Sequence, residues 1–426
     1  MYFLSRQFGA GPNAAILSAV LALSFARRRA EGESHTWKRD LGGISVVGIG
    51  AAGVAWLLYT YFFFGAALFT AGLFLSVWLR RFGGRLRQFG SVMALPFIGL
   101  LMAPGAPHAA GGPGADLLLV LLAGVIAFAF DRLLLLLEPS APLAYAPPSR
   151  PAEQGALSTS TRMAVQMGIA LAAAFLAGRF LFPGRWSWVV ITAFIVCSGA
   201  IGRGDAAYKG VLRLLGAFLG VIAATALQYV AVPHGPAAAV LIFAVLFVGV
   251  WLRDVNYAWW AACVTVILAL LLPASDTSVT VLLSERLAAI FVGAICGVAA
   301  CWFVLPIKTR SVVRRRLADI LLALEEWAGA PEPERAQKLQ VVESCAGECE
   351  RIAVPLRWQK RLERIKDDAE HPAVWLSIVQ RCARDAASEP PPADMVKAVR
   401  LSRRALKEDQ GLTPALLKVQ ALLESD

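Results

Sequence analysis

The sequence predicts an all-α, polytopic membrane protein, and three observations lead to that fold class. Hydrophobic residues make up 58% of the 426 residues and charged residues only 17%, whereas soluble domains carry about 25% charged residues. Apolar runs long enough for a helix to cross a bilayer recur along residues 1–306. Residues 307–426 contain no such run. Together, these features exclude most classes of soluble enzyme.

Eleven membrane-spanning helices are expected in the first 306 residues. The apolar runs cover about residues 9–26, 41–59, 61–79, 88–104, 117–137, 163–182, 186–202, 208–232, 236–252, 257–273 and 287–305. The continuous stretch 41–79 is too long for one crossing, because about 20 residues at 1.5 Å each span the hydrocarbon core. A hairpin that turns near Tyr59, Thr60 and Tyr61 is therefore predicted.

The distribution of Lys and Arg predicts how these spans are oriented. Sixteen of these residues in 1–306 fall on one side of the predicted spans, and four fall on the other, namely Arg6, Arg179, Arg185 and Arg286. Cytoplasmic loops carry the excess of positive charge in multi-pass proteins. We therefore expect the amino terminus outside and the carboxy-terminal segment in the cytoplasm.

The net charge of +11 does not predict a nucleic-acid partner. Residues 1–306 hold 20 Lys and Arg against 11 Asp and Glu, and residues 307–426 hold 21 against 19. The hydrophilic segment is thus nearly balanced and offers no field of one sign for DNA or RNA. The basic excess belongs to the membrane part, where the orientation of the spans accounts for it.

Short matches between the two halves indicate an internal repeat. VWLRR at 77–81 corresponds to VWLRD at 250–254, and LMAPGA at 101–106 to LLPAS at 271–275. The halves also share an Arg that opens a Gly-rich span and a Pro that follows the closing span; these residues are Arg39, Arg213, Pro139 and Pro306. Repeated halves are common in secondary transporters. We predict two parallel repeats of about five and six spans, the first lacking its opening helix.

Four segments are expected along the chain. Residues 1–138 form the first transmembrane repeat, 139–160 a flexible cytoplasmic linker rich in Pro, Ser and Ala, 161–306 the second transmembrane repeat, and 307–426 a cytoplasmic helical domain. In the last segment we expect several helices, including LADILLALEEWAG and AVWLSIVQRCARDAAS. Pro and charge interrupt their apolar faces, which favours a small helical domain over a long coiled coil.

Ionisable residues within spans are the first candidates for function, because a charge in the bilayer is costly. Asp131 and Arg132 lie toward the inner end of a span. They either line a cavity, or pair with each other while Arg132 reaches the headgroups. The carboxylates available for coupling to an ion or proton gradient are Asp131, Glu285, Asp205 and Asp254.

Charged residues at helix ends form a second set of candidates. Arg39 and Arg213 open Gly-rich spans, and Glu285 and Arg286 open the last span. We interpret them as groups that attract an anionic substrate into a water-filled vestibule. The alternative for Arg39 and Arg213 is that they anchor the spans at the lipid interface.

Aromatic residues and glycines at the spans have both structural and functional interpretations. Asp254, Trp259 and Trp260 stand where a loop meets a span, as part of an interfacial aromatic belt or as a stacking surface for a substrate. Two glycine pairs have small-xxx-small spacing, which predicts close helix packing. These pairs are Gly216 with Gly220, and Gly293 with Gly297.

The common enzyme templates are absent from the sequence. It contains no Walker A, GxSxG or HExxH pattern, so we expect neither enzymatic activity nor a cofactor. Cys345 and Cys349 lie one helical turn apart. A metal half-site is one interpretation, but two thiols without a second pair are a weak zinc pattern. No metal is expected.

The second half of the chain resembles a known family. The stretches RMAVQMGIALAAAFLAGRFLFPGRWSWVVITAFIV, RGDAAYKGVLRLLGAFLGVIAATAL and SERLAAIFVGAICGVAACWFVLP are similar to the membrane domain of the fusaric acid resistance (FUSC) and aromatic acid exporter proteins. The features that carry the resemblance are Trp186, Arg213 with its two glycines, Arg286 with Gly293, and the closing Pro306. The resemblance covers residues 160–306, and residues 9–139 as a degenerate copy.

The resemblance implies an inner-membrane efflux component of Gram-negative bacteria for aromatic carboxylic acids, which in some members works with a periplasmic adaptor protein. We expect an exporter of small organic anions that is driven by the proton gradient and forms a homo-oligomer in the lipid bilayer. Two alternatives stay open. One is a non-transporting scaffold whose cytoplasmic tail binds a partner, and the other is an anion channel.

Overall fold

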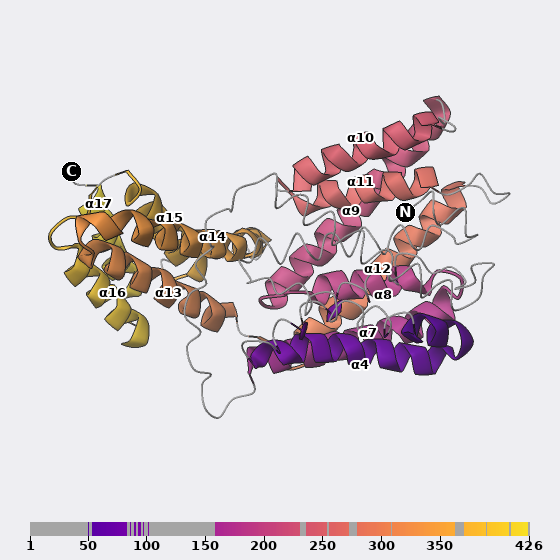
Figure 1. The fold of residues 1–426 in the computed structure, drawn as a ribbon, viewed down its shortest axis with the longest axis horizontal. Coiled ribbons are helices and arrows are strands. Elements are labelled where there is room, and N and C mark those ends of the chain that lie inside the picture. Colours follow the sequence, from indigo (N-terminus) through magenta and orange to yellow (C-terminus); the bar gives the residue numbers. More distant parts are fainter. Residues whose placement is uncertain are drawn as a thin grey trace. The chain divides into compact units, whose positions relative to one another are not determined.

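The computed structural model describes residues 53–82 and 158–424 except for 231–235, 254, 272–278, 308, 363–369, 389 and 409, together with positions 50, 86, 89, 90, 93, 94, 97 and 101. Within these residues the regular elements are all helices, with no strand. The predicted all-α class is therefore confirmed for this part of the chain (Figure 1).

Eight helical elements lie in the apolar part of the described chain. They are α4 (Phe62–Trp78), η1 (Leu79–Arg81), α7 (Thr159–Leu181), α8 (Trp186–Cys197), α9 (Arg203–Val230), α10 (Pro236–Arg253), α11 (Tyr257–Leu271) and α12 (Val279–Phe303). Four segments are long and apolar enough to cross a bilayer: Phe62–Arg81, Thr159–Leu181, Arg203–Leu227 and Leu283–Phe303. The total of eleven spans and the repeat of two halves stay predictions.

The chain reverses direction at Tyr61, as the sequence predicts. The helical stretch 53–60 ends there and α4 begins at the next residue. A Cβ atom on Gly65 would lie only 2.3 Å from the backbone nitrogen of Leu58. Residues seven positions apart cannot approach so closely in a continuous helix, since its rise is 1.5 Å per residue. The long apolar stretch is therefore a hairpin.

The chain divides into two compact units. The first, which we call the membrane unit, comprises Met1–Pro142, Gln154–Ala200 and Lys209–Pro306. The second, which we call the C-terminal unit, comprises Leu143–Glu153, Ile201–Tyr208 and Ile307–Asp426. In the membrane unit α7 packs on α4, α8 and α12, α8 packs on α12, and α10 pairs with α11 (Figure 1).

Glycines allow the helices of the membrane unit to pack closely. A Cβ atom on Gly293 of α12 would lie 2.3 Å from the carbonyl oxygen of Val189 in α8. A Cβ atom on Gly216 of α9 would lie equally close to the carbonyl oxygen of Ala258 in α11. Any larger side chain would force these helices apart. The predicted packing role of the glycine pairs is thus confirmed; their second members are Gly220 and Gly297.

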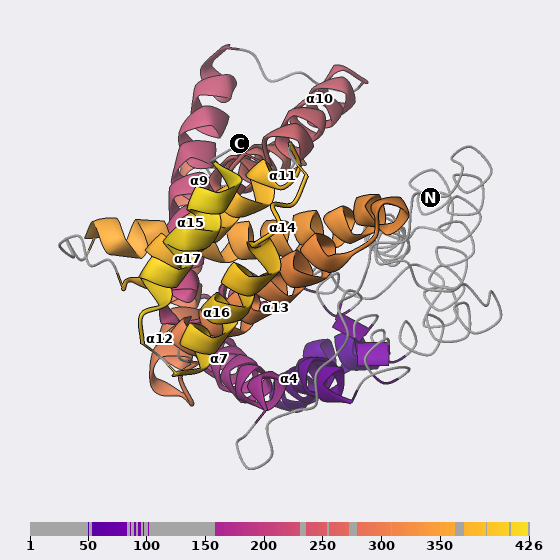
Figure 2. The same ribbon diagram turned by 90° about the vertical axis from the view of Figure 1, so that its left-hand side faces the viewer.

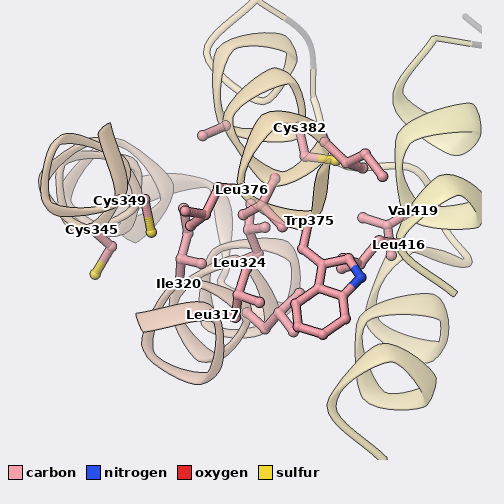
Figure 3. Close-up of a cluster of buried hydrophobic side chains, with 14 of the residues drawn as sticks. Leu317, Ile320, Leu324, Cys345, Cys349, Trp375, Leu376, Cys382, Leu416 and Val419 are labelled. Atoms are coloured by element: carbon pink, nitrogen blue, oxygen red, sulfur yellow. The ribbon is translucent and has the colours of Figure 1, made fainter. Parts of the chain in front are cut away.

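The C-terminal unit has its own hydrophobic core. Its helices are α13 (Thr309–Gly329), α14 (Glu332–Leu362), α15 (Pro372–Asp385), α16 (Met395–Glu408) and α17 (Leu412–Leu423) (Figure 2). Side chains from these helices meet around the buried Trp375, whose Nε1 donates a hydrogen bond to Thr413 Oγ1 at 2.9 Å (Figure 3). The hydrophilic segment is therefore helical, as predicted, and its location in the cytoplasm stays a prediction.

The cysteines considered as a metal half-site lie in this core. Cys345 and Cys349 are both buried, and burial raises the pKa of the Cys349 thiol to about 12. A thiol binds metal as the thiolate, so such a group is a poor ligand at neutral pH. Among the described residues no group of three or more His, Cys, Asp or Glu side chains is placed to hold a metal ion.

Candidate functional site

The candidate site lies in the membrane unit, where α8, α9 and α12 meet. Gly293 brings α12 against α8, and Gly210 of α9 brings that helix to within van der Waals distance of the Val298 side chain of α12. Small residues let helix backbones approach where larger side chains would hold them apart. Long side chains from α9 and α12 therefore share one interior space.

Two arginines occupy this interior. Arg213 on α9 exposes only 2% of its surface to solvent, and Arg286 on α12 exposes 4%. The two guanidinium groups lie close enough for each positive charge to act on the other. Two buried like charges repel each other and have lost their hydration, so this arrangement is costly unless a ligand compensates it.

Both arginines lie deeper than the sequence predicted, which is a correction. They were expected to open their spans, but α9 begins at Arg203 and α12 at Val279. Arg213 thus lies about 15 Å along its helix and Arg286 about 10 Å, at 1.5 Å per residue. Both helices begin earlier than the predicted spans. The burial of Arg213 favours an interior role over that of an anchor at the lipid interface.

The arginines present unpaired hydrogen-bond donors. In both side chains Nε and Nη2 are buried and, in the part of the chain that the structure describes, have no hydrogen-bond partner. These two nitrogens form one edge of the guanidinium plane, and that edge matches a carboxylate or phosphate with two parallel hydrogen bonds. Each arginine therefore presents one edge with the geometry to bind an anion.

The first turn of α8 completes the site. The guanidinium carbon of Arg286 lies 4.2 Å from the centroid of the Trp188 ring, which fixes the plane of that guanidinium by a cation–π contact. The neighbouring Ser187 is 1% exposed and its Oγ is unpaired within the described residues. The N-terminus of a helix also favours an anion, because its first N–H groups have no intrahelical partner.

The sequence singled out Trp186 instead of Trp188. Trp186 packs against Phe62 and Phe175, with ring centroids 5.3 and 5.5 Å apart. It belongs to an aromatic cluster between α4, α7 and α8, and the structure shows no contact between it and the arginines. Sequence analysis overlooked Trp188 and Ser187, although the WSW stretch stands at a helix start where anion ligands are favoured.

Glu285 has a different partner from the one its position suggests. It adjoins Arg286 in the chain, yet its carboxylate pairs with Arg185 at 3.1 Å, and both side chains are partly exposed. This ion pair joins the start of α8 to α12. Asp205, in the first turn of α9, accepts a hydrogen bond from the Ile201 backbone N–H at 3.0 Å. Neither interaction neutralises the arginine pair.

Four of the predicted site residues cannot be placed. Arg39, Asp131, Arg132 and Asp254 lie outside the residues that the structure describes. Their roles stay predictions. Of the predicted set, the structure brings together only Arg213 and Arg286.

An apolar groove of about 480 Å³ runs along α9 and α12. Leu214, Phe218, Leu287 and Phe291 are among its lining residues. Neither Arg213 nor Arg286 lines it, because both arginines lie on the interior faces of these helices. The groove is therefore separate from the anion site.

Several apolar helices, four of them long enough to cross a bilayer, define the class of protein: a multi-pass α-helical membrane protein with two buried arginines in its membrane unit. Residues 169–300 match the family described as fusaric acid resistance protein-like. This segment of the chain is thus similar to that family's domain, and the resemblance drawn from the sequence is confirmed. It contains Ser187, Trp188, Arg213 and Arg286.

Curated relatives match a similar portion of the chain. One is the p-hydroxybenzoic acid efflux pump subunit AaeB of Escherichia coli O9:H4 (strain HS), 28% identical over 177 residues. The protein of the same name from Pantoea ananatis (strain LMG 20103) is 27% identical over 179 residues. Both alignments cover 38% of this chain and 27% of the relative. The match thus spans about a quarter of the length of these relatives.

Proposed function

We propose that this chain exports small organic anions, with aromatic carboxylic acids as its substrates, across the inner membrane of a bacterium. The observation that carries the proposal is the buried, unpaired pair Arg213 and Arg286 inside a family-matched membrane unit. The printed name of the relatives gives p-hydroxybenzoic acid as the compound that they export, which supports the same class of substrate here.

The site residues have distinct tasks in this mechanism. The substrate carboxylate accepts hydrogen bonds from the Nε and Nη2 atoms of the arginines, and the gain is large because the surroundings exclude water. Trp188 fixes the plane of the Arg286 guanidinium group through their cation–π contact. It also offers the edge of its ring to the aromatic ring of the substrate. The chain itself supplies no cofactor-dependent step, and we propose transport without enzymatic chemistry.

Export against a gradient needs an energy source, and we propose the proton gradient. Glu285 is the described carboxylate best placed for it, since its salt bridge with Arg185 joins α8 to α12 beside the arginine pair. Protonation of Glu285 releases Arg185 and loosens this connection. Asp131 and Asp254 are further candidates from the sequence.

The remaining parts of the proposal concern assembly. We propose that the carboxy terminus lies in the cytoplasm, an orientation that the basic loops support. The word subunit in the relatives' name supports a partner in the assembled pump, for which we propose a periplasmic adaptor protein. We also propose that the chain forms a homo-oligomer in the bilayer.

The test is flux through the purified full-length protein in sealed vesicles. Labelled p-hydroxybenzoate should cross faster when a pH gradient is imposed, and Arg286→Gln should reduce this flux at least tenfold, about 1.4 kcal/mol of lost binding. Arg179→Gln is the matched control, because Arg179 is exposed on α7. Flux absent from the wild-type protein, or unchanged in Arg286→Gln, would contradict the proposal.

A further inference from the structure

We propose that the arginine pair binds a dianionic ligand, with an aromatic dicarboxylate as its chemical class. This inference deepens the proposed function and rests on it. It differs from the substrate in the relatives' printed name, p-hydroxybenzoic acid, which carries a single carboxyl group. The observations that carry it are two separate bidentate edges, one on the buried Arg213 of α9 and one on the buried Arg286 of α12, two helices that approach each other to van der Waals distance.

The number of unpaired donors is the first reason. Each arginine exposes both Nε and Nη2 to the interior without a partner among the described residues. One such edge gives one carboxylate two parallel N–H bonds at the spacing of its two oxygens. A single carboxylate that bridged both arginines would lose this parallel geometry at one of them, whereas two carboxylates give each edge its own partner.

The charge of the site is the second reason. Two positive charges are buried together, and a monoanion would leave one of them uncompensated. The described carboxylate that adjoins Arg286 in the chain is already engaged, because Glu285 pairs with Arg185. A dianion neutralises the site as a whole.

The orientation of Arg286 is the third reason. Trp188 covers one face of its guanidinium at 4.2 Å. A ligand must therefore meet Arg286 at its edge, in the plane of the group, where Nε and Nη2 are available. Ser187 Oγ, on the residue before Trp188, is also buried and unpaired in the described structure and offers one more donor. A flat aromatic ring with two carboxylates fits such a planar arrangement.

The experiment compares isophthalate with benzoate as ligands of the purified full-length protein, by titration calorimetry. These compounds share the ring and differ by one carboxylate. We expect isophthalate to bind about tenfold more tightly, with one molecule per chain, because the second carboxylate engages the second arginine edge. Arg213→Lys and Arg286→Lys keep the charge but lose the planar edge, and each should reduce the preference to about twofold or less.

Arg179→Lys is the matched control, since it makes the same change at an exposed position of α7, and it should leave the preference intact. The inference is overturned if benzoate binds as tightly as isophthalate, if two benzoates bind per chain, if neither ligand binds, or if the preference survives in both lysine variants. The export proposal and the dianion inference can fail independently. If vesicles pass p-hydroxybenzoate but the protein does not prefer isophthalate, only the dianion inference is contradicted. If the protein prefers isophthalate but no acid crosses the membrane, only the export proposal is contradicted.

Discussion

At the scale of single residues, the molecule keeps two charges where physical chemistry disfavours them. Arg213 and Arg286 are almost fully buried, near each other and without partners among the described residues. Structural arginines in proteins are normally paired, since an unpaired buried charge costs several kcal/mol. This cost supports the proposed binding site, because a bound anion compensates buried positive charge.

A stability measurement tests this view of Arg213. Arg213→Met removes one of the two charges and fills a similar volume, so the ligand-free protein should become more stable by about 1–4 kcal/mol. The melting temperature of the purified protein without ligand should therefore rise. Arg179→Met, at an exposed site, should change it little. A lower melting temperature for Arg213→Met would mean that Arg213 has a stabilising partner.

At the scale of helices, close packing depends on glycine at a few positions. The α8–α12 contact that holds the site requires no side chain at Gly293, where a Cβ atom would lie 2.3 Å from Val189 O and 2.8 Å from Thr192 Cβ. Both neighbours belong to α8, and one of them is backbone. The helices must therefore separate to admit even a methyl group.

Gly293→Ala should thus destabilise the membrane unit by about 1–3 kcal/mol and weaken anion binding, because Arg286 and Trp188 lie on the two helices concerned. Thermal unfolding and ligand titration of the same sample measure both effects. Gly184→Ala serves as control, since nothing lies within 4 Å of the added atom. Equal stability of the two variants would show that α8 and α12 adjust without cost.

A second helix contact gives a pH-dependent prediction. Glu325 of α13 accepts hydrogen bonds from Arg400 and Arg403 of α16, with 2.8 Å to Arg400 Nε. Burial raises the pKa of Glu325, but the hydrogen bonds and charges of the two arginines outweigh it, so the pKa is lowered overall. A lowered folded-state pKa gives stability that is present above the unfolded pKa of about 4.3 and is lost as the pH falls through the folded value.

Glu325→Gln should accordingly lower the stability of the C-terminal unit at neutral pH by about 1 kcal/mol. The difference from wild type should vanish on acidification below about pH 4. Chemical unfolding followed by circular dichroism at several pH values measures this. Glu332→Gln is the control, because Glu332 is 86% exposed in its ion pair with Arg335. A difference that persists at low pH would assign the effect to packing instead.

At the scale of the whole molecule, the C-terminal unit is built independently around its own core. It also includes the start of α9: Ile201 packs against the core, and the Tyr208 ring lies 5.4 Å from that of Trp358. This compact construction is the feature that favours the scaffold alternative, in which the tail binds a partner.

Removal of residues 312–426 separates the two functions. An exporter should keep measurable flux of p-hydroxybenzoate in vesicles, since Arg213, Arg286 and Trp188 all remain in the shortened chain. Its stability should decrease, because Ile201 and Tyr208 lose their partners. If flux is complete in the full-length protein but disappears in the shortened chain that still folds, the tail is part of the transport mechanism. If neither chain passes acid, the scaffold is favoured.

The sequence by itself determined the membrane class, the presence of the described helices, the hairpin at Tyr61, the packing glycines and the family resemblance. These properties depend on composition and on patterns within one helix, which one chain displays directly. The sequence also selected Arg213 and Arg286, because charged residues that open a span can attract an anionic substrate.

Only the tertiary structure decided how these residues are used. It brought Arg213 and Arg286 into one interior space, left their bidentate edges unpaired, placed Trp188 instead of Trp186 over Arg286, and paired Glu285 with Arg185. Such contacts join residues on different helices, and they depend on which faces pack together and how closely. The periodicity of a single helix shows that a face exists, but the neighbour against which it packs is set by the fold.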